Sequence, residues 1–375
     1  MTTLVFILII GSVIFLFPYV LLLITFLLSR KRVIFKIINK VDVLPSISIV
    51  IATYNEEKNI DKKIENILNL DYPKNKMEII VVDSSNDKTP DKVLEWTDSF
   101  PNLTLIRELE RKGLATALNL GYATAKGEIV IKSDCDITHP VNALQQIVNP
   151  FYDSSVGAVT GKQILINSPS ASIRSEKGYR SLKDFICEIH SRLDSTHIFE
   201  PFSAYKKELI EPISVNSVAD DGELALLIRK KGYKTIFQRE AHFFETAPVT
   251  MIDKLRQKSR RGQGHVQLLL QNLDILFNRK YGYFGLVIFP TIFFLMIINP
   301  WLLLGLGMGA IYLISDIVVI NYVLLLIAAS TFLVLLYGFG YPMFISGFIE
   351  SQISLIIGTV SLIISGPSYM WEKKN

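Results

Sequence analysis

The sequence predicts an α/β domain whose sheet is parallel, joined at both ends to membrane-spanning helices. Short β-branched apolar runs alternate with helical segments between residues 46 and 132. This alternation is typical of a parallel sheet with helices on both faces. The chain is also 50% hydrophobic, with a mean hydropathy of +0.35, and its charges are concentrated in the middle. These observations indicate a membrane protein that carries one large soluble domain.

Two long apolar stretches enclose the charged region. Residues 4–28 are almost uncharged, and residues 285–364 are apolar apart from Asp316 and Glu350. Since one span needs about 20 apolar residues, they predict one transmembrane helix and about three, respectively. No positive residue precedes the first stretch, and it is longer than the apolar part of a usual signal peptide, so we expect it to be retained. The predicted regions are 1–29, 30–282 and 283–375.

Basic residues follow the first apolar stretch and precede the second, at positions 30–32, 36 and 40 and at positions 279–280. The positive-inside rule therefore predicts a multi-pass protein of the cell membrane whose soluble domain is cytoplasmic. With three C-terminal spans, Lys373 and Lys374 would lie outside, where lysines are not expected. Two spans and an interfacial helix would return this tail to the cytoplasm, so both arrangements stay open.

Composition and missing motifs argue against a disulfide, a zinc site, nucleic-acid binding and two classes of enzyme. Cys135 and Cys187 are the sole cysteines, in a domain expected on the reducing side, so we predict no disulfide and no zinc site. The net charge of +4 is modest, and no basic face is interleaved with aromatic residues, so nucleic acid is not an expected partner. Neither a Gly-x-Gly-x-x-Gly motif nor a P-loop follows any predicted strand, which disfavours hydride transfer and P-loop ATPase activity.

The elements of the soluble domain are predicted in chain order. Each apolar β-branched run is expected to be a strand, each amphipathic segment a helix, and the Asn-, Ser- and Pro-rich stretch a loop. The expected elements are a strand at 46–52, a turn at 53–57, a helix to about residue 70, a strand at 78–83, a helix at 89–100, a strand at 103–107, a helix at 113–124, a strand at 128–132 and a loop at 166–175.

Three of these strands end in polar turns, at residues 53–56, 83–87 and 134–136. Because ligands of such sheets bind beyond the carboxyl ends of the strands, the three turns are expected to line one cleft. Asp134 and Asp136 are the notable pair, since carboxylate oxygens are the ligands that Mg²⁺ and Mn²⁺ prefer. Such ions commonly bridge one or two carboxylates to substrate phosphates. The alternative for this pair is a solvated turn.

Five motifs in this order resemble those of the family 2 glycosyltransferases. The resemblance covers about residues 46–264 and extends to the helix layout of membrane-embedded members such as hyaluronan, cellulose and poly-N-acetylglucosamine synthases. It implies a GT-A-type fold and a nucleotide-sugar donor, with UDP as the expected nucleotide. The motifs are IATYNE at 51–56, VVDSSND at 81–87, RKGLATALN at 111–119, DCD at 134–136 and ADDGEL at 219–224.

The resemblance assigns donor-binding roles to matching positions. Thr53, Tyr54, Glu56 and Asp83 would hold the nucleoside, with Asp83 accepting a hydrogen bond from the base. The alternative for Asp83 is a cap on the following helix or turn. Lys112 would lie near the diphosphate, although a single lysine is often a solvated surface charge.

The same resemblance assigns the acidic pairs. Asp134 and Asp136 correspond to the metal-binding pair, with Asp136 favoured as the direct ligand of Mg²⁺ or Mn²⁺. Asp221 corresponds to the catalytic base and Asp220 to the acid beside it, which contributes to substrate binding. The alternative is that Asp220 and Asp221 favour the start of the helix that follows them.

Residues 257–264 stand where many membrane-embedded members carry Gln-x-x-Arg-Trp. Gln257 and Arg260 match, and Arg261 replaces the tryptophan. In the family this segment contacts the donor diphosphate and the acceptor, and a guanidinium pairs well with phosphate. Loss of an aromatic surface for a sugar argues against processive extension. The alternative for the cations between 254 and 261 is attraction to anionic membrane lipids.

Two further features are interpreted without a functional role. The histidines at 139, 190, 197, 242 and 265 have no metal-ligand spacing and are expected on the surface or in loops, although His190 or His197 could line the acceptor path. Glu350 would be costly facing lipid, so it either marks a loop or interfacial turn, or faces a protein interior or polar channel.

The resemblance therefore implies inverting transfer of a sugar to a lipid-linked or polysaccharide acceptor at the membrane. Arg261 and the small number of spans favour single addition or short extension over a processive polysaccharide synthase. The alternative from another class is a non-catalytic membrane subunit that binds a nucleotide sugar without turnover.

Overall fold

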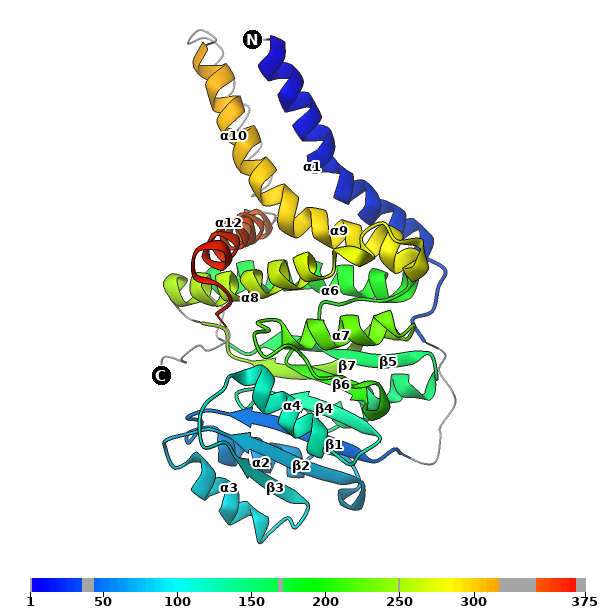
Figure 1. Cartoon of the computed structure of the whole chain (residues 1–375), viewed down its shortest axis with the longest axis vertical. Coiled ribbons are helices and arrows are strands. Elements are labelled where there is room, and N and C mark those ends of the chain that lie inside the picture. Colours follow the sequence, from blue (N-terminus) through cyan, green and yellow to red (C-terminus); the bar gives the residue numbers. More distant parts are fainter. Residues whose placement is uncertain (1, 36–43, 168–170, 249, 317–341, 369–375) are drawn as a thin grey trace. The chain divides into compact units, whose positions relative to one another are not determined.

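The computed structural model describes residues 2–35, 44–167, 171–248, 250–316 and 342–368 (Figure 1). The chain forms two compact units. The sheet unit contains Leu28–Asn167, Asp184–Ala247 and Ser365–Asn375. The helical unit contains Met1–Leu27, Ser168–Lys183 and Pro248–Ile364.

The sheet unit is built on seven strands in the order β3-β2-β1-β4-β6-β5-β7. Strands β1 to β4 are mutually parallel and lie close to the predicted positions. Strand β6 is antiparallel to both β4 and β5, so the sheet is mixed where the sequence pattern predicted a parallel one. The strands are β1 Ile47–Thr53, β2 Met77–Asp83, β3 Leu103–Arg107, β4 Ile129–Ser133, β5 Val156–Leu165, β6 Phe202–Lys206 and β7 Lys234–Glu245.

The α-helices between β1 and β4 begin and end near the predicted residues. The prediction of a loop over 166–175 was wrong at its end, because α6 already begins at Ala171. Helix α4 follows Gly113, whose φ of 97° is a conformation that residues with a Cβ avoid. The helices are α2 Ile60–Leu68, α3 Thr89–Thr97, α4 Leu114–Thr124, α5 Ala143–Val148, α6 Ala171–Leu193 and α7 Asp220–Lys230.

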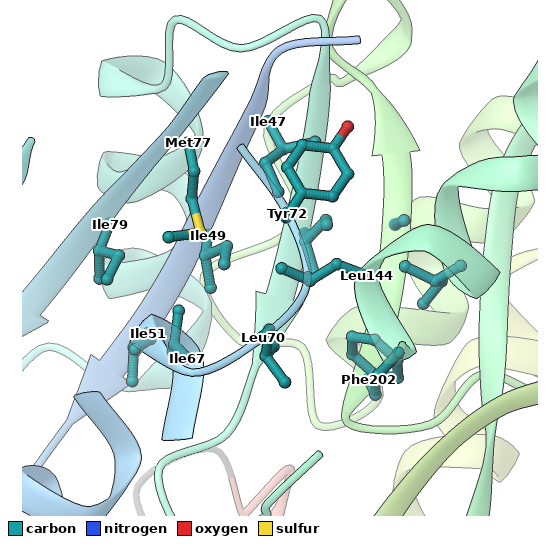
Figure 2. Close-up of a cluster of buried hydrophobic side chains, with 14 of the residues drawn as sticks. Ile47, Ile49, Ile51, Ile67, Leu70, Tyr72, Met77, Ile79, Leu144 and Phe202 are labelled. Atoms are coloured by element: carbon teal, nitrogen blue, oxygen red, sulfur yellow. The ribbon is translucent and has the colours of Figure 1, made fainter. Parts of the chain in front are cut away.

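Alternate residues of each central strand enter two separate hydrophobic clusters, one on each face of the sheet. Ile47, Ile49 and Ile51 of β1 pack with Ile67 of α2 and Leu144 of α5 (Figure 2). Val50, between them in sequence, packs in the cluster of the opposite face, which contains residues of α4 and α7. This period of two follows from the pleat of a strand, and it also determines which face each polar side chain of a strand reaches.

Among the described residues, three helices are long and apolar enough to span a membrane, and they lie mainly in the helical unit: Thr3–Ser29, Phe284–Gly309 and Gly347–Ser365. The first agrees with the predicted N-terminal span. The sequence predicted about three spans in the C-terminal region, and part of that prediction falls on residues 317–341, which lie outside the described residues. The helices are α1 Thr2–Ser29, α8 Met251–Gln271, α9 Phe289–Phe293, α10 Asn299–Asp316 and α12 Pro342–Ser365.

The expectation that each histidine lies on the surface or in a loop was wrong for His190, which is 0% exposed on a helix. His139 and His197 lie in loops but are also buried, at 5% and 1% exposed. His190 lies on α6, and neither of its ring nitrogens has a hydrogen-bond partner among the described residues. Burial lowers the pKa of His190 to about 3. This burial could not be predicted, because spacing along the chain does not report burial.

Replacing His190 by leucine should make the free energy of unfolding less dependent on pH under acidic conditions. Below pH 6.5 the unfolded chain binds a proton at this ring, whereas the folded chain does not until about pH 3. Folded-state stability is therefore lost as pH falls through this window, by up to about 1.4 kcal/mol per pH unit. Chemical denaturation at pH 4–7 in detergent would measure this. Equal slopes in the wild type and His190→Leu would contradict a neutral, buried His190.

Candidate functional site

A pocket opens at the carboxyl ends of the parallel strands, where the sequence placed the cleft. Its wall contains five of the predicted site residues, from the turn after β1 and the turn after β4. The lining residues are Ala52, Thr53, Tyr54, Glu56, Ser84, Arg111, Gly113, Leu114, Ala117, Asp134, Cys135 and Asp136. Two of the three predicted turns thus contribute strongly, and the third contributes Ser84.

Asp83 ends β2 and is fully buried behind this wall. Its Oδ1 accepts hydrogen bonds from Thr53 Oγ1 at 2.7 Å and Ser85 Oγ at 2.5 Å. Its Oδ2 accepts from the backbone N–H of Ser85 at 3.1 Å and from the Arg107 guanidinium. Four donors fill the acceptor positions of one carboxylate. Asp83 therefore links β1, β2 and β3 through hydrogen bonds. Its two bonds from Ser85 cap the turn after β2, as the alternative interpretation of this residue predicted.

Arg111 is a pocket residue that the sequence reasoning missed. Its guanidinium carbon lies 3.8 Å from the centre of the Tyr54 ring, a distance typical of a cation–π contact. The neighbouring Lys112, which was predicted near the diphosphate, is exposed and is not among the residues that line the pocket. A guanidinium held over an aromatic ring in the pocket wall is the better placed of the two cations to meet an anion there.

Asp134 and Asp136 follow β4 directly, and both line the pocket. Asp136 is exposed and the Asp134 side chain is 35% exposed, so both offer oxygens to the open space. Among the described residues no group of three or more His, Cys, Asp or Glu side chains is arranged to hold a metal ion. Two carboxylates that leave the remaining positions to water and phosphate oxygens suit Mg²⁺ or Mn²⁺, which keep several non-protein ligands.

Lys132, one residue before the end of β4, is 2% exposed and is a second residue that the sequence reasoning missed. Its Nζ lies 2.6 Å from Asp220 Oδ2, 2.7 Å from Asp221 Oδ1 and 3.7 Å from Asp134 Oδ1. Burial lowers the pKa of this amine, but the three carboxylates outweigh burial and raise the pKa well above its usual value. A lysine in the apolar run Ile129–Ser133 was the available signal, since a cation in a buried strand needs a partner.

Asp220 and Asp221 form the first turn of α7, as the helix-start alternative predicted. The same two residues also contact Lys132, and their roles as base and substrate-binding acid stay a prediction. Burial, followed by the charge of Asp220, raises the pKa of Asp221 well above its usual value, while Lys132 opposes this. A carboxylate with a raised pKa is better matched to accepting a proton near neutral pH than an ordinary aspartate is.

The remaining predicted residues, Gln257, Arg260 and Arg261, are partly buried on α8 of the helical unit. Their contact with a donor stays a prediction.

Two basic residues of the same helix, Lys254 and Lys258, do not fit the alternative that the cations of this segment bind anionic lipids. Lys254 Nζ lies 2.6 Å from Glu350 Oε2, and Lys258 Nζ lies 2.9 Å from Glu176 Oε2. These four side chains join α6, α8 and α12 within the helical unit, so Lys254 and Lys258 pair with protein carboxylates rather than with lipid. Glu350 thereby faces a protein interior, which was one of its two interpretations.

Comparison with protein families finds two adjoining matches. Residues 48–213 match "Glycosyl transferase family 2", and residues 191–345 match "Glycosyl transferase family group 2". The chain belongs to glycosyltransferase family 2.

Individual relatives of this glycosyltransferase are distant. It is 28% identical to the probable glycosyltransferase YdaM of Bacillus subtilis over 63% of the chain and 59% of the relative. It is 26% identical to a poly-beta-1,6-N-acetyl-D-glucosamine synthase of Staphylococcus aureus over 62% of the chain and 57% of the relative. The chain thus matches less than two thirds of the length of these relatives.

One solved structure matches along almost its whole length. It is the mannosyltransferase PcManGT of Pyrobaculum calidifontis in complex with GDP-Man and Mn²⁺. The TM-score is 0.77 at 25% identity, and the match covers 95% of this glycosyltransferase and 99% of the other chain. The GT-A-type fold expected from the sequence motifs is therefore confirmed.

Replacing Lys132 by methionine should destabilise this glycosyltransferase strongly. The substitution leaves Asp220 and Asp221 without their buried cation, and breaking a buried ion pair on one side typically costs about 3–5 kcal/mol. Denaturant unfolding of metal-free protein would measure the loss, with Lys126→Met as the control because Lys126 is exposed. Equal stability of the two variants would contradict the bridging role of Lys132.

Proposed function

We propose that this protein transfers a sugar from a nucleotide sugar to a membrane-associated acceptor, with inversion and with the help of Mg²⁺ or Mn²⁺. The observation that supports this most is the placement of the two acidic pairs. Lys132 contacts both Asp134 of the predicted metal pair, which lines the pocket, and Asp221, the predicted base, so one buried ammonium holds the two carboxylates close together. Transfer with inversion needs the metal-bound leaving group and the base in one site, on opposite faces of the anomeric carbon.

Asp134 and Asp136 would hold the divalent ion. When bound, the ion neutralises charge on the departing nucleoside diphosphate. The mannosyltransferase that this chain resembles was solved with Mn²⁺ and GDP-Man, which supports a divalent metal and a nucleotide sugar here as well.

Asp221 would accept the proton of the acceptor hydroxyl while that oxygen attacks the anomeric carbon and the diphosphate leaves from the opposite face. One base and direct displacement account for inversion without a covalent intermediate. The raised pKa of Asp221 suits this role. Asp220, also paired with Lys132, would help to hold the donor side of the site.

The donor would lie along the pocket wall. Thr53, Tyr54 and Glu56 would contact the nucleoside, and the Arg111 guanidinium would face the phosphates. Asp83 would accept a hydrogen bond from the base only if one of its four present donors moved aside, and Arg107 is the most exposed of their side chains.

Two sets of cations would complete the donor and acceptor sites. Lys112 would add positive charge near the diphosphate from an exposed position. Gln257, Arg260 and Arg261 of α8 would contribute to the diphosphate and acceptor side, as the family resemblance implies.

The acceptor would be lipid-linked or a growing saccharide, because three helices among the described residues are suited to a membrane. We propose a multi-pass protein of the cell membrane with a cytoplasmic sheet unit.

The nucleotide of the donor would be UDP, as the family resemblance implies, or GDP, as in the GDP-Man bound to the solved mannosyltransferase. Sugars of both nucleotides therefore belong in the assay. Single addition is preferred over processive synthesis because Arg261 removes an aromatic surface for a sugar.

Purified protein in lipid should release nucleotide from one member of a panel of UDP, GDP and dTDP sugars with Mn²⁺ or Mg²⁺. Asp136→Ala should abolish release by removing a metal ligand. Asp221→Asn should lower kcat by about 10²–10⁴-fold while sparing donor binding, because only the base is lost. Tight donor binding without turnover in membrane lipid extract, unaffected by Asp221→Asn, would favour the non-catalytic subunit instead.

Arg111→Met should raise the donor KM more than Lys112→Met does. Loss of one charge-assisted hydrogen bond costs about 1.5–3 kcal/mol, which corresponds to roughly a tenfold or larger rise for Arg111. The two variants remove the same charge at adjacent positions, so each controls for the other. A larger rise in Lys112→Met would show that the exposed lysine, and not the pocket arginine, contacts the phosphates.

A further inference from the structure

A second buried lysine lies beneath the metal-binding turn, on the face of the sheet opposite to that of Lys132. Lys63 of α2 is 1% exposed, and its Nζ donates to Ser133 Oγ at 2.6 Å and to the carbonyl oxygen of Ile137 at 2.9 Å. The third neighbour of this nitrogen is His139 Nε2 at 3.3 Å. An ammonium has three N–H donors, so these three groups match its full hydrogen-bonding capacity.

The positions of these acceptors along the chain are informative. Ser133 immediately precedes Asp134, and Ile137 immediately follows Asp136. Lys63 thus holds the residue before and the residue after the Asp134–Cys135–Asp136 segment, and it contacts both from one atom. The loop that carries both carboxylates is closed over a single buried nitrogen.

Asn66, one turn further along α2, adds a second attachment to the same loop. Its Nδ2 donates to the carbonyl oxygen of His139 at 3.0 Å, and its Oδ1 accepts from the backbone N–H of His139 at 2.8 Å. Residues three apart on a helix share a face, so Lys63 and Asn66 act on the loop together. Ser133 Oγ also lies 2.8 Å from His139 Nε2, which links the two attachments.

We propose that Lys63 is a positioning residue that fixes the Asp134–Asp136 loop in the geometry needed to bind the divalent ion. The proposal rests on the metal role given to Asp134 and Asp136 under the proposed function. Groups that orient metal ligands without touching the metal typically contribute 10- to 100-fold to metal affinity. Lys63 acts through the backbone and Ser133, and it does not itself contact the pocket.

The charge of Lys63 and its hydrogen bonds have opposite effects on the affinity for the metal ion. The direction of the measured change therefore distinguishes them. Burial lowers the pKa of Lys63 to about 8, so the amine is mostly protonated at pH 7 and repels a nearby cation. Removing the charge alone would tighten metal binding. Removing the hydrogen bonds would loosen the loop and weaken metal binding, and the proposal states that this second effect is the larger.

The experiment is a titration of purified full-length protein with Mn²⁺ at pH 7, in the presence of GDP and in a parallel series with UDP. Free Mn²⁺ is measured by electron paramagnetic resonance, which requires no turnover. Lys63→Met, which keeps the approximate length of the side chain but has no donor, should raise the Mn²⁺ dissociation constant at least tenfold. Lys62→Met is the matched control, because Lys62 is exposed on the same helix, and it should leave the constant unchanged.

Ser133→Ala serves as a milder variant if Lys63→Met does not fold. It deletes one acceptor of the lysine and should raise the same constant by a smaller factor. A dissociation constant that is unchanged or lower in the variants, even with a lower melting temperature, would mean that Lys63 has a structural role only. Wild-type protein that binds no Mn²⁺ with either nucleotide would instead contradict the metal dependence of the proposed function.

Discussion

The candidate site depends on the ammonium of Lys132 and the carboxylates around it. This cation is buried at the end of the middle strand of the sheet and contacts residues from the turn after β4 and from the first turn of α7. Without it, three carboxylates would share a poorly solvated region and repel one another, and protonation would relieve that repulsion. With it, Asp221 lies close to the predicted metal pair while the acidic start of α7 is retained.

The end of β4 is held from both faces of the sheet, which follows from the alternation of side chains along a strand. Lys132 reaches α7 on one face, whereas Ser133 meets Lys63 of α2 on the other. The mixed topology contributes as well, since the antiparallel β6 pairs with β4 at residues 129–133, up to the residue before the Asp134–Asp136 loop. The Asp134–Asp136 loop is thus fixed by backbone pairing before it and by a buried amine beneath it.

The helical unit satisfies its buried charges by the same principle. Glu350 stands in an otherwise apolar helix, and it is neutralised by Lys254 and Lys258 of α8, which also pair with Glu176 of α6. Close helix packing accompanies these pairs, because a Cβ at Gly358 would lie 2.6 Å from the carbonyl oxygen of Ser259. The charged residues therefore join α12 to α8 and α6, which accounts for a glutamate that hydropathy alone makes costly.

The sequence by itself determined the order and approximate bounds of β1 to β4, the helices between them and the N-terminal apolar helix, because hydrophobic periodicity is a local property. It also determined the five motifs and thereby the family, together with the pocket residues Thr53, Tyr54, Glu56, Asp134 and Asp136. The tertiary structure decided which cations lie beside the acidic residues and turns of the site. Arg107, Arg111, Lys132 and Lys63 are distant in sequence from most of their partners, and their burial depends on how strands and helices pack. It also decided that β6 is antiparallel and that His139, His190 and His197 are buried, since strand pairing and burial arise from contacts between distant segments.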